Sequence, residues 1–197
     1  MSGVWIFGYG SLVSPTSFGF TLGRELLMGV DVFEAELDGY GRRWNYGTAT
    51  RFWAPRLDDG RDHHWTFVAL GIEAAAGETT NGVVAHVTDD ELPALDRRER
   101  NYDRVDVTDQ VTIHGRGGPS TGDRIVTYVP GATAIDLYET ARARGEAAIT
   151  RRYWDLVDGA FAALGHDRRE RYHATTPLPD IPVIVAPDEQ TPVRHRA

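Results

Sequence analysis

The chain has 197 residues and a mass of 21.9 kDa, the size of one domain with room for a short tail. Its 29 acidic and 21 basic residues give a net charge of −8, which argues against nucleic acid as a main partner. The sequence has no cysteine, which excludes disulfides, thiolate nucleophiles and thiolate metal ligands. No apolar run approaches the ~18 residues of a membrane-spanning helix, and the N-terminus lacks the features of a secretory signal. We therefore expect a cytoplasmic protein with no membrane partner.

Short strands and glycine-rich turns dominate the first two thirds of the chain. The apolar run from Val4 to Phe7 is typical of a buried strand, and a glycine-rich turn at 8–12 follows it. Ser14-Pro15 then predicts that no helix begins at once, because proline disfavours helical geometry in the residue before it. Further strands are expected at 30–37, 66–72, 81–87, 102–113 and 124–129, with a loop at 54–64, a turn at Asn81-Gly82 and a glycine loop at 115–122.

Helices are expected at 88–100, 134–144 and 149–164, and Tyr153 is one of the residues at apolar positions of the last helix. Prolines recur from position 177 onward, which divides the chain into a domain at 1–176 and a Pro-rich, extended C-terminal tail at 177–197. Strands precede most of the helices, an order that favours an α+β fold over alternating βαβ units. Many short strands with glycine turns favour a mixed sheet that curls toward a small β-barrel.

The turn Tyr9-Gly10-Ser11-Leu12 is the first candidate for a binding site. A strand followed by glycines exposes backbone N–H groups that point the same way and can bind a carboxylate or a phosphate. A plain tight turn is the alternative interpretation. The turn does not fit a dinucleotide fingerprint, because Val13 stands at the third glycine position. It does not fit a nucleophile elbow around Ser11 either, because Tyr9 stands where a glycine is needed.

Glu99, in the helix expected at 88–100, is the second candidate. At about 100° per residue, Leu92, Leu95 and Glu99 share one face, whereas the charged residues at 96–98 and 100 point elsewhere. A carboxylate on an apolar face needs a partner or a raised pKa, and a raised pKa suits general acid–base catalysis near neutral pH. The alternative is a buried ion pair with one of the many arginines.

Other polar residues carry weaker signals. The histidines show no HxH or HxxxH spacing, so we expect no metal site. Arg42-Arg43 could hold a carboxylate, but a surface or salt-bridge role is the simpler interpretation. The aromatic residues between Trp44 and Trp53 are typical of a core or of a pocket lining.

The opening sequence VWIFGYGSLV resembles the signature of the γ-glutamylcyclotransferase superfamily, which includes the ChaC-type glutathione-degrading enzymes. In that family a YGSL-type loop follows the first strand, and a glutamate lies on a short helix in an L-D-x-x-E pattern before a tyrosine and a strand. Here Leu95 to Glu99 fit this pattern and Tyr102 follows. Looser matches extend the resemblance over roughly residues 4–173. The segment 44–65 has no counterpart in the family pattern, so the substrate stays open.

The resemblance implies a small mixed β-barrel flanked by helices and an enzyme that needs no cofactor and no metal. In the family's reaction the α-amine of a γ-glutamyl group attacks its own γ-carbonyl, which releases the attached amine and forms 5-oxoproline. Glu99 is then expected to be the catalytic acid–base. The loop from Tyr9 to Leu12 is expected to hold the substrate α-carboxylate through its N–H groups, with Tyr102 and Tyr128 as pocket-lining residues or core tyrosines.

The expected partner is therefore a small-molecule γ-glutamyl substrate, and the chain is expected to act as a monomer or a homodimer. Because the loop would act through its backbone, Ser11→Ala is expected to have a mild effect. Two alternatives stay open: an inactive module that binds a γ-glutamyl group or carboxylate, and an amide hydrolase with the same pocket. Glu99 argues against the first, because a buried carboxylate without a use is costly to keep.

Overall fold

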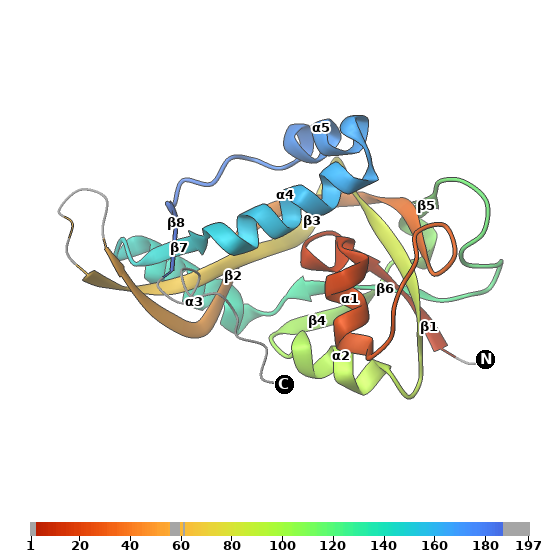
Figure 1. Cartoon of the computed structure of the whole chain (residues 1–197), viewed down its shortest axis with the longest axis horizontal. Helices are drawn as coiled ribbons and strands as arrows, with labels where there is room; N and C mark the ends of the chain where they lie inside the picture. The colour runs from red at the N-terminus through yellow and green to blue at the C-terminus, as the bar shows by residue number, and fades with distance from the viewer. Residues whose placement is uncertain (1–2, 56–59, 61, 187–197) are drawn as a thin grey trace, which may run out of the picture.

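The computed structural model describes residues 3–55, 60 and 62–186 of the chain (Figure 1). Its strands are β1 Gly3–Gly8, β2 Val32–Pro55, β3 Asp62–Thr88, β4 Tyr102–Asp106, β5 Val111–Ile113, β6 Ile125–Pro130, β7 Ala147–Thr150 and β8 Val183–Ile184. Its helices are α1 Pro15–Leu22, α2 Leu92–Arg98, α3 Ala132–Ala143, α4 Arg151–Leu164 and α5 His166–Thr175, with short 3-10 turns at η1 Ser11–Val13 and η2 Thr108–Gln110.

The sheet is mixed. Its strand order is β4-β6-β1-β3-β2-β5, and β7 pairs with β3 and with β8. Strand β1 runs antiparallel to β3 and parallel to β6, so the first strand of the chain lies in the middle of the sheet. The two ends of the order, β4 and β5, are joined in the chain through η2 alone. The predicted α+β class is confirmed, and closure of the sheet into a barrel stays a prediction.

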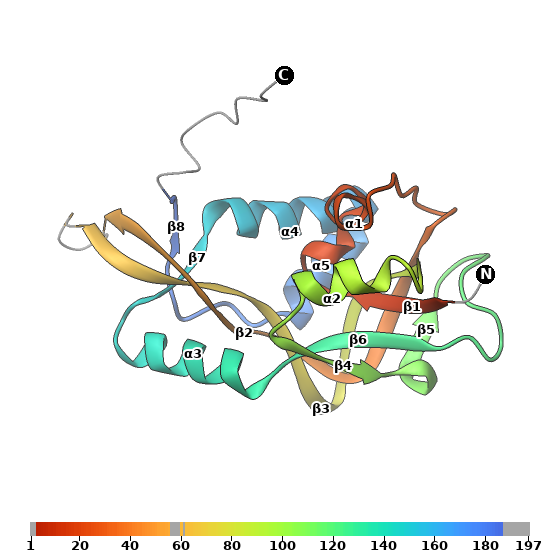
Figure 2. The same ribbon diagram turned by 90° about the horizontal axis from the view of Figure 1, so that it is seen from below.

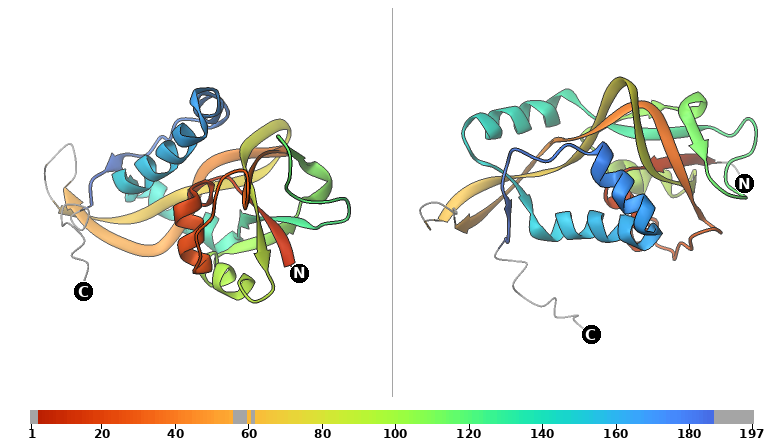
Figure 3. Two further views of the ribbon diagram at one scale, coloured as in Figure 1. Left: turned by 45° about the vertical axis from the view of Figure 1, so that its right-hand side comes forward. Right: turned by 90° about the horizontal axis from the view of Figure 1, so that it is seen from above.

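Strands β2 and β3 form one long hairpin that extends past the rest of the sheet (Figure 3). The sequence predicts shorter separate strands here, and the predicted turn at Asn81-Gly82 is wrong because Asn81 pairs with Glu36 inside β3. A Cβ on Gly82 would lie 2.2 Å from the carbonyl oxygen of Gly8. The glycine therefore marks a close approach between β1 and β3 rather than a turn.

Helix α1 also differs from the prediction. Ser14 is its N-cap, with extended backbone geometry, and the Ser14 Oγ accepts a hydrogen bond from the N–H of Ser17 at 3.2 Å. Pro15 takes the first helical position, where a missing N–H removes no helical hydrogen bond. The dipeptide predicted to prevent a helix therefore starts one. The sequence pattern also misses α5, β7 and β8, and η2 interrupts the strand expected at 102–113.

The helices fall into two groups. Helices α3 and α4 lie on opposite sides of the β2–β3 hairpin (Figure 2). Helices α1 and α2 lie side by side near β1, and η1 contacts both α1 and α4. The predicted binding loop after β1 therefore lies where three helices meet the sheet.

The segment after α5 packs along the molecule as far as it is described. Val183 pairs with Ile149 of β7, and Ile181 and Ile184 are buried. Residues 187–197 of the predicted tail lie outside the described residues. Among the described residues, no helix has the length and apolar character needed to cross a membrane.

Candidate active site

Glu99 is the first residue after α2. Its N–H donates to the carbonyl of Leu95 at 2.9 Å, which completes the last turn of the helix. Leu95 is fully buried beneath it, and the Glu99 side chain is only 12% exposed. The carboxylate thus lies on the inward face of α2, as the spacing of Leu92, Leu95 and Glu99 predicts.

Arg98, which the helical spacing places away from Glu99, is in fact its ion-pair partner. The Nε of Arg98 lies 3.1 Å from the Oε1 of Glu99. The two terminal nitrogens of Arg98 donate to the Ser17 carbonyl, the Thr21 hydroxyl, the Ser17 hydroxyl and the Ser11 hydroxyl, at 2.6–3.1 Å. With those N–H groups occupied, Arg98 connects Glu99 to α1 and to the glycine loop. It fixes the carboxylate and has no terminal N–H left for a ligand.

Two opposing effects act on the pKa of Glu99. Burial disfavours the charged carboxylate and raises the pKa, and the Arg98 guanidinium lowers it. Burial is the larger effect, so the pKa lies above its ordinary value of 4.5. This is the direction that a carboxylate needs in order to exchange protons near neutral pH.

The raised pKa predicts a dependence of stability on pH. Between the ordinary pKa and the raised one, the folded protein binds more protons at Glu99 than the unfolded chain does, so stability falls as pH rises through this window. Glu99→Gln removes this effect. We therefore expect the stability of the variant relative to the wild type to increase when the pH is raised from about 4 to about 7.5. Urea unfolding of both proteins at the two pH values measures this difference in the free energy of unfolding. An equal difference at the two pH values would contradict a raised pKa.

The loop Tyr9-Gly10-Ser11-Leu12 presents backbone donors that its own turn does not use. The helical bonds of η1 begin with the N–H of Val13, which donates to the carbonyl of Gly10 at 3.0 Å. The N–H groups of Gly10, Ser11 and Leu12 precede these bonds and have no partner within the turn. The side chain of Leu12 points into the main hydrophobic core. These N–H groups are the donors that a carboxylate ligand would require.

Arg42 holds the first residue of this loop, Tyr9, in place from within the core. It is fully buried, and its Nε donates to the carbonyl of Tyr9 at 3.0 Å. Its terminal nitrogens donate to the Thr176 hydroxyl at 2.8 Å and to the backbone carbonyl and side-chain oxygen of Asn81. One buried side chain therefore connects the loop, β3 and the segment after α5.

Arg42 has no carboxylate partner among the described residues, so the predicted surface or salt-bridge role is wrong for it. Its guanidinium lies 5.0 Å from the ring centres of both Phe161 and Tyr172, and its burial lowers its pKa to about 10. The prediction fits Arg43 instead, which pairs with Glu73 and Glu78 at 2.8 and 2.7 Å.

Tyrosines surround Glu99. Its negative charge contributes to raising the pKa of Tyr9, Tyr102 and Tyr153, although burial is the largest cause in each. Tyr102 stacks on Tyr46 with ring centres 4.0 Å apart. The sequence predicts Tyr9 and Tyr102 as site residues, whereas it marks Tyr153 only as an apolar position of α4 and Tyr46 only as part of an aromatic cluster.

Tyr128 faces the outer side of α2. Its hydroxyl donates to the Oδ1 of Asp96 at 2.8 Å, and its carbonyl accepts a hydrogen bond from the Tyr9 hydroxyl at 2.7 Å. Burial raises its pKa, and the hydrogen bond with Asp96 adds to that effect. Tyr128 therefore holds Tyr9 through its backbone carbonyl, and the charge of Glu99 also contributes to raising the pKa of its hydroxyl.

The aromatic residues between Trp44 and Trp53, which are predicted to form a core or a pocket lining, do not all lie together. Trp44 is buried and stacks on Trp154 of α4, with ring centres 5.2 Å apart. Trp53 is 59% exposed on the far part of the hairpin and stacks on His64 at 4.9 Å. Trp53 thus takes no part in the cluster around Glu99.

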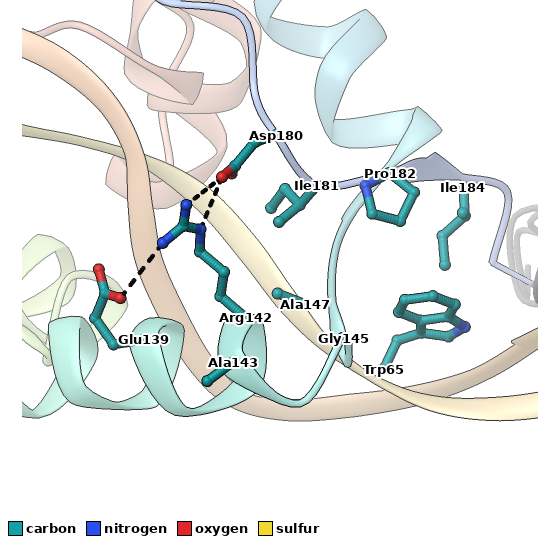
Figure 4. Close-up of a pocket in the computed structure, with 10 residues that line it drawn as sticks. All are labelled: Trp65, Glu139, Arg142, Ala143, Gly145, Ala147, Asp180, Ile181, Pro182 and Ile184. Atoms are coloured by element: carbon teal, nitrogen blue, oxygen red, sulfur yellow. Dashed lines mark hydrogen bonds and ion pairs between the residues drawn. The ribbon is translucent and has the colours of Figure 1, made fainter.

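A pocket of about 500 Å³ lies between α3 and β8 and contains none of the predicted site residues (Figure 4). Trp65 and Ile184 contribute apolar walls, and Arg142 pairs with Asp180 and with Glu139 at the rim. The one arginine of the pocket is paired with both of its acidic side chains, so we assign the pocket no catalytic role. Among the residues that the structure describes, no group of acidic and histidine side chains is arranged to hold a metal ion.

The chain is similar to known proteins in sequence and in fold. No family model matches the sequence. The chain is 27% identical over 179 residues to γ-glutamylcyclotransferase 2-3 of Arabidopsis thaliana, covering 82% of this chain and 81% of that protein. It is similar in structure to a γ-glutamyl cyclotransferase (TM-score 0.54, 14% identity, 96% of both chains). It is also similar to an uncharacterized protein from Homo sapiens (TM-score 0.57, 16% identity, 96% of this chain and 97% of that one).

The chain has the fold of the γ-glutamyl cyclotransferases. Sequence similarity and fold point to the same group, and the resemblance to the γ-glutamylcyclotransferase superfamily that the two motifs predict is confirmed.

Proposed function

We propose that the protein is a γ-glutamylcyclotransferase, which converts a γ-glutamyl compound into 5-oxoproline and releases the amine attached to the γ-carbonyl. The observation that carries the proposal is that two features form one connected site. The buried carboxylate of Glu99 pairs with Arg98, and Arg98 donates a hydrogen bond to Ser11 of the glycine loop. The N–H groups of this loop are not used by its own turn. The plant relative, named as a γ-glutamylcyclotransferase, supports the same general activity.

In the proposed mechanism, the loop binds the α-carboxylate of the substrate through the N–H groups of Gly10, Ser11 and Leu12. This anchors one end of the glutamyl chain and leaves its α-amine and γ-carbonyl free to approach each other. Holding the bent conformer converts ring closure into a favoured intramolecular step.

Glu99 moves the protons. The α-amine is protonated at neutral pH and cannot attack until a base removes a proton from it. Glu99 takes that proton, the nitrogen attacks the γ-carbon, and Glu99 returns a proton to the leaving nitrogen as its bond to carbon breaks. Over the whole reaction two protons leave the attacking nitrogen and two reach the released ammonium group, so no water is consumed.

The substrate panel that tests the proposal is glutathione, γ-glutamyl-alanine and γ-glutamyl-ε-lysine, with 5-oxoproline measured as the product. Formation from any of the three supports the proposed class, and the preferred compound identifies the leaving amine. Glutamate in place of 5-oxoproline would indicate the amide hydrolase. Ligand binding without either product would indicate the inactive binding module.

Ser11→Ala tests how the loop acts. The Ser11 hydroxyl accepts one of the hydrogen bonds from the terminal nitrogens of Arg98, and the bonds to Ser17 and Thr21 remain in the variant. The lost hydrogen bond positions Arg98 and does not touch the substrate, so we expect kcat/KM to fall by less than about tenfold. A loss of more than about 100-fold in steady-state 5-oxoproline formation would mean that the hydroxyl itself contacts the reacting atoms.

A further inference from the structure

The backbone of Leu70 in β3 binds two tyrosine hydroxyls with opposite polarity. The hydroxyl of Tyr102 donates to the carbonyl of Leu70 at 3.0 Å. The N–H of Leu70 donates to the hydroxyl oxygen of Tyr153 at 3.3 Å. The proton of Tyr102 is therefore used within the protein, whereas Tyr153 is bonded as an acceptor and its own proton is not committed by this contact.

No acceptor for the O–H of Tyr153 is found among the residues that the structure describes. The Tyr153 side chain is half-buried, and a hydroxyl in such a place normally finds partners for both its donor and its acceptor. Burial raises the pKa of Tyr153 further above its ordinary value, so the phenol keeps its proton throughout the neutral range. The side chain therefore has a permanent donor that the fold itself does not use.

This donor lies near both parts of the proposed site. A Cβ on Gly10 would lie 3.1 Å from the Tyr153 hydroxyl, so the phenol is directly over the binding loop, and a glycine keeps that space open. Glu99 is close enough to raise the pKa of Tyr153 through its charge. The hydroxyl therefore lies against the loop and within electrostatic range of the carboxylate.

We propose, on the basis of the proposed cyclotransferase function, that Tyr153 is a further catalytic residue that donates a hydrogen bond to the γ-carbonyl oxygen of the substrate. When the α-amine attacks the γ-carbon, the carbonyl π electrons move onto this oxygen, which becomes negatively charged. The Tyr153 O–H stabilises that charge and keeps its proton. When the carbonyl re-forms, the bond to the leaving nitrogen breaks and Glu99 supplies the proton to that nitrogen.

Tyr153→Phe and Tyr102→Phe form a matched pair for the test. Each removes one hydroxyl from the same cluster and one hydrogen bond to Leu70, so both are expected to lower the melting temperature by similar amounts. Only Tyr153→Phe removes a donor that is free for the substrate. We expect its kcat for 5-oxoproline formation to fall by about 10²–10³-fold with KM within about threefold of wild type, and we expect a clearly smaller fall in kcat for Tyr102→Phe.

The outcomes separate the two proposals. If the wild-type enzyme forms 5-oxoproline and the two variants have similar kcat values, the role of Tyr153 is overturned and the cyclotransferase function still stands. A rise in KM at constant kcat in Tyr153→Phe would also overturn it, because the hydroxyl would then hold the substrate rather than the developing charge. Absence of 5-oxoproline with folded wild-type protein over the whole substrate panel would reject the proposed function and, with it, this role.

Discussion

Glu99→Gln is expected to lower kcat for 5-oxoproline formation by about 10²–10⁴-fold, the range that general acid–base groups contribute. The amide has the shape of the carboxylate and can still accept from Arg98, but it cannot remove a proton from the α-amine. Loss of turnover should therefore occur without loss of the fold. Steady-state kinetics and circular dichroism on the same preparation measure both.

Glu91→Gln is the matched control for this variant. Glu91 stands directly before α2 and pairs with Arg24 at 2.6 Å, outside the cluster around Glu99. Its pKa is lowered by hydrogen bonds from Arg24 and Thr88, which outweigh the effect of burial. The control should lose stability at neutral pH and keep its activity. Wild-type kcat in Glu99→Gln would remove Glu99 as the catalytic base.

The largest loss of stability is expected for Arg42→Met, at about 3–5 kcal/mol in the free energy of unfolding. Hydrogen bonds to a charged group are worth about 1.5–3 kcal/mol each. The variant leaves the Tyr9 carbonyl and both oxygens of Asn81 without these donors in a buried site. Freed from Arg42, the first peptide of the binding loop should also lose its fixed orientation, which raises KM. Urea unfolding and substrate titration measure these two effects.

Arg43→Met provides the comparison, because it changes the neighbouring arginine. Its pairs with Glu73 and Glu78 are on the partly exposed side of β2, where an ion pair is worth about 0–1 kcal/mol. We expect a small change in stability and no change in KM. Equal losses in the two variants would show that the burial of Arg42 has no special importance for the loop.

The sequence predicts the features that local patterns encode. The apolar run before Gly8 predicts β1, the order of elements predicts the α+β class, and the apolar stripe of α2 places Glu99 on its inner face. The prediction at Ser14-Pro15 is wrong because the same residues either end a helix or begin one, depending on whether the serine side chain caps the next turn. The hydrogen bond from Ser17 settles this, and only the folded chain shows it.

Contacts between distant segments lie beyond local patterns. Nothing in the dipeptide Arg42-Arg43 says which guanidinium is buried, because this depends on rings from α4 and α5 more than 100 residues away. Helical spacing places Arg98 away from Glu99, yet α2 ends between the two, and the long arginine side chain reaches back to the carboxylate. Tyr153 fits a helical apolar stripe equally well with or without a function, and its hydrogen bond from Leu70 is visible only in the folded chain.

In the proposed reaction an internal amine, and not water, attacks the γ-carbonyl with Glu99 as the base. Turnover of the preferred γ-glutamyl compound in water enriched in oxygen-18 tests this most directly, with the products analysed by mass spectrometry. We predict unlabelled 5-oxoproline in equal amount to the released amine, with both products formed about 10²–10⁴-fold more slowly by Glu99→Gln. Glutamate carrying one oxygen-18 atom would show attack by water and would contradict the cyclotransferase mechanism.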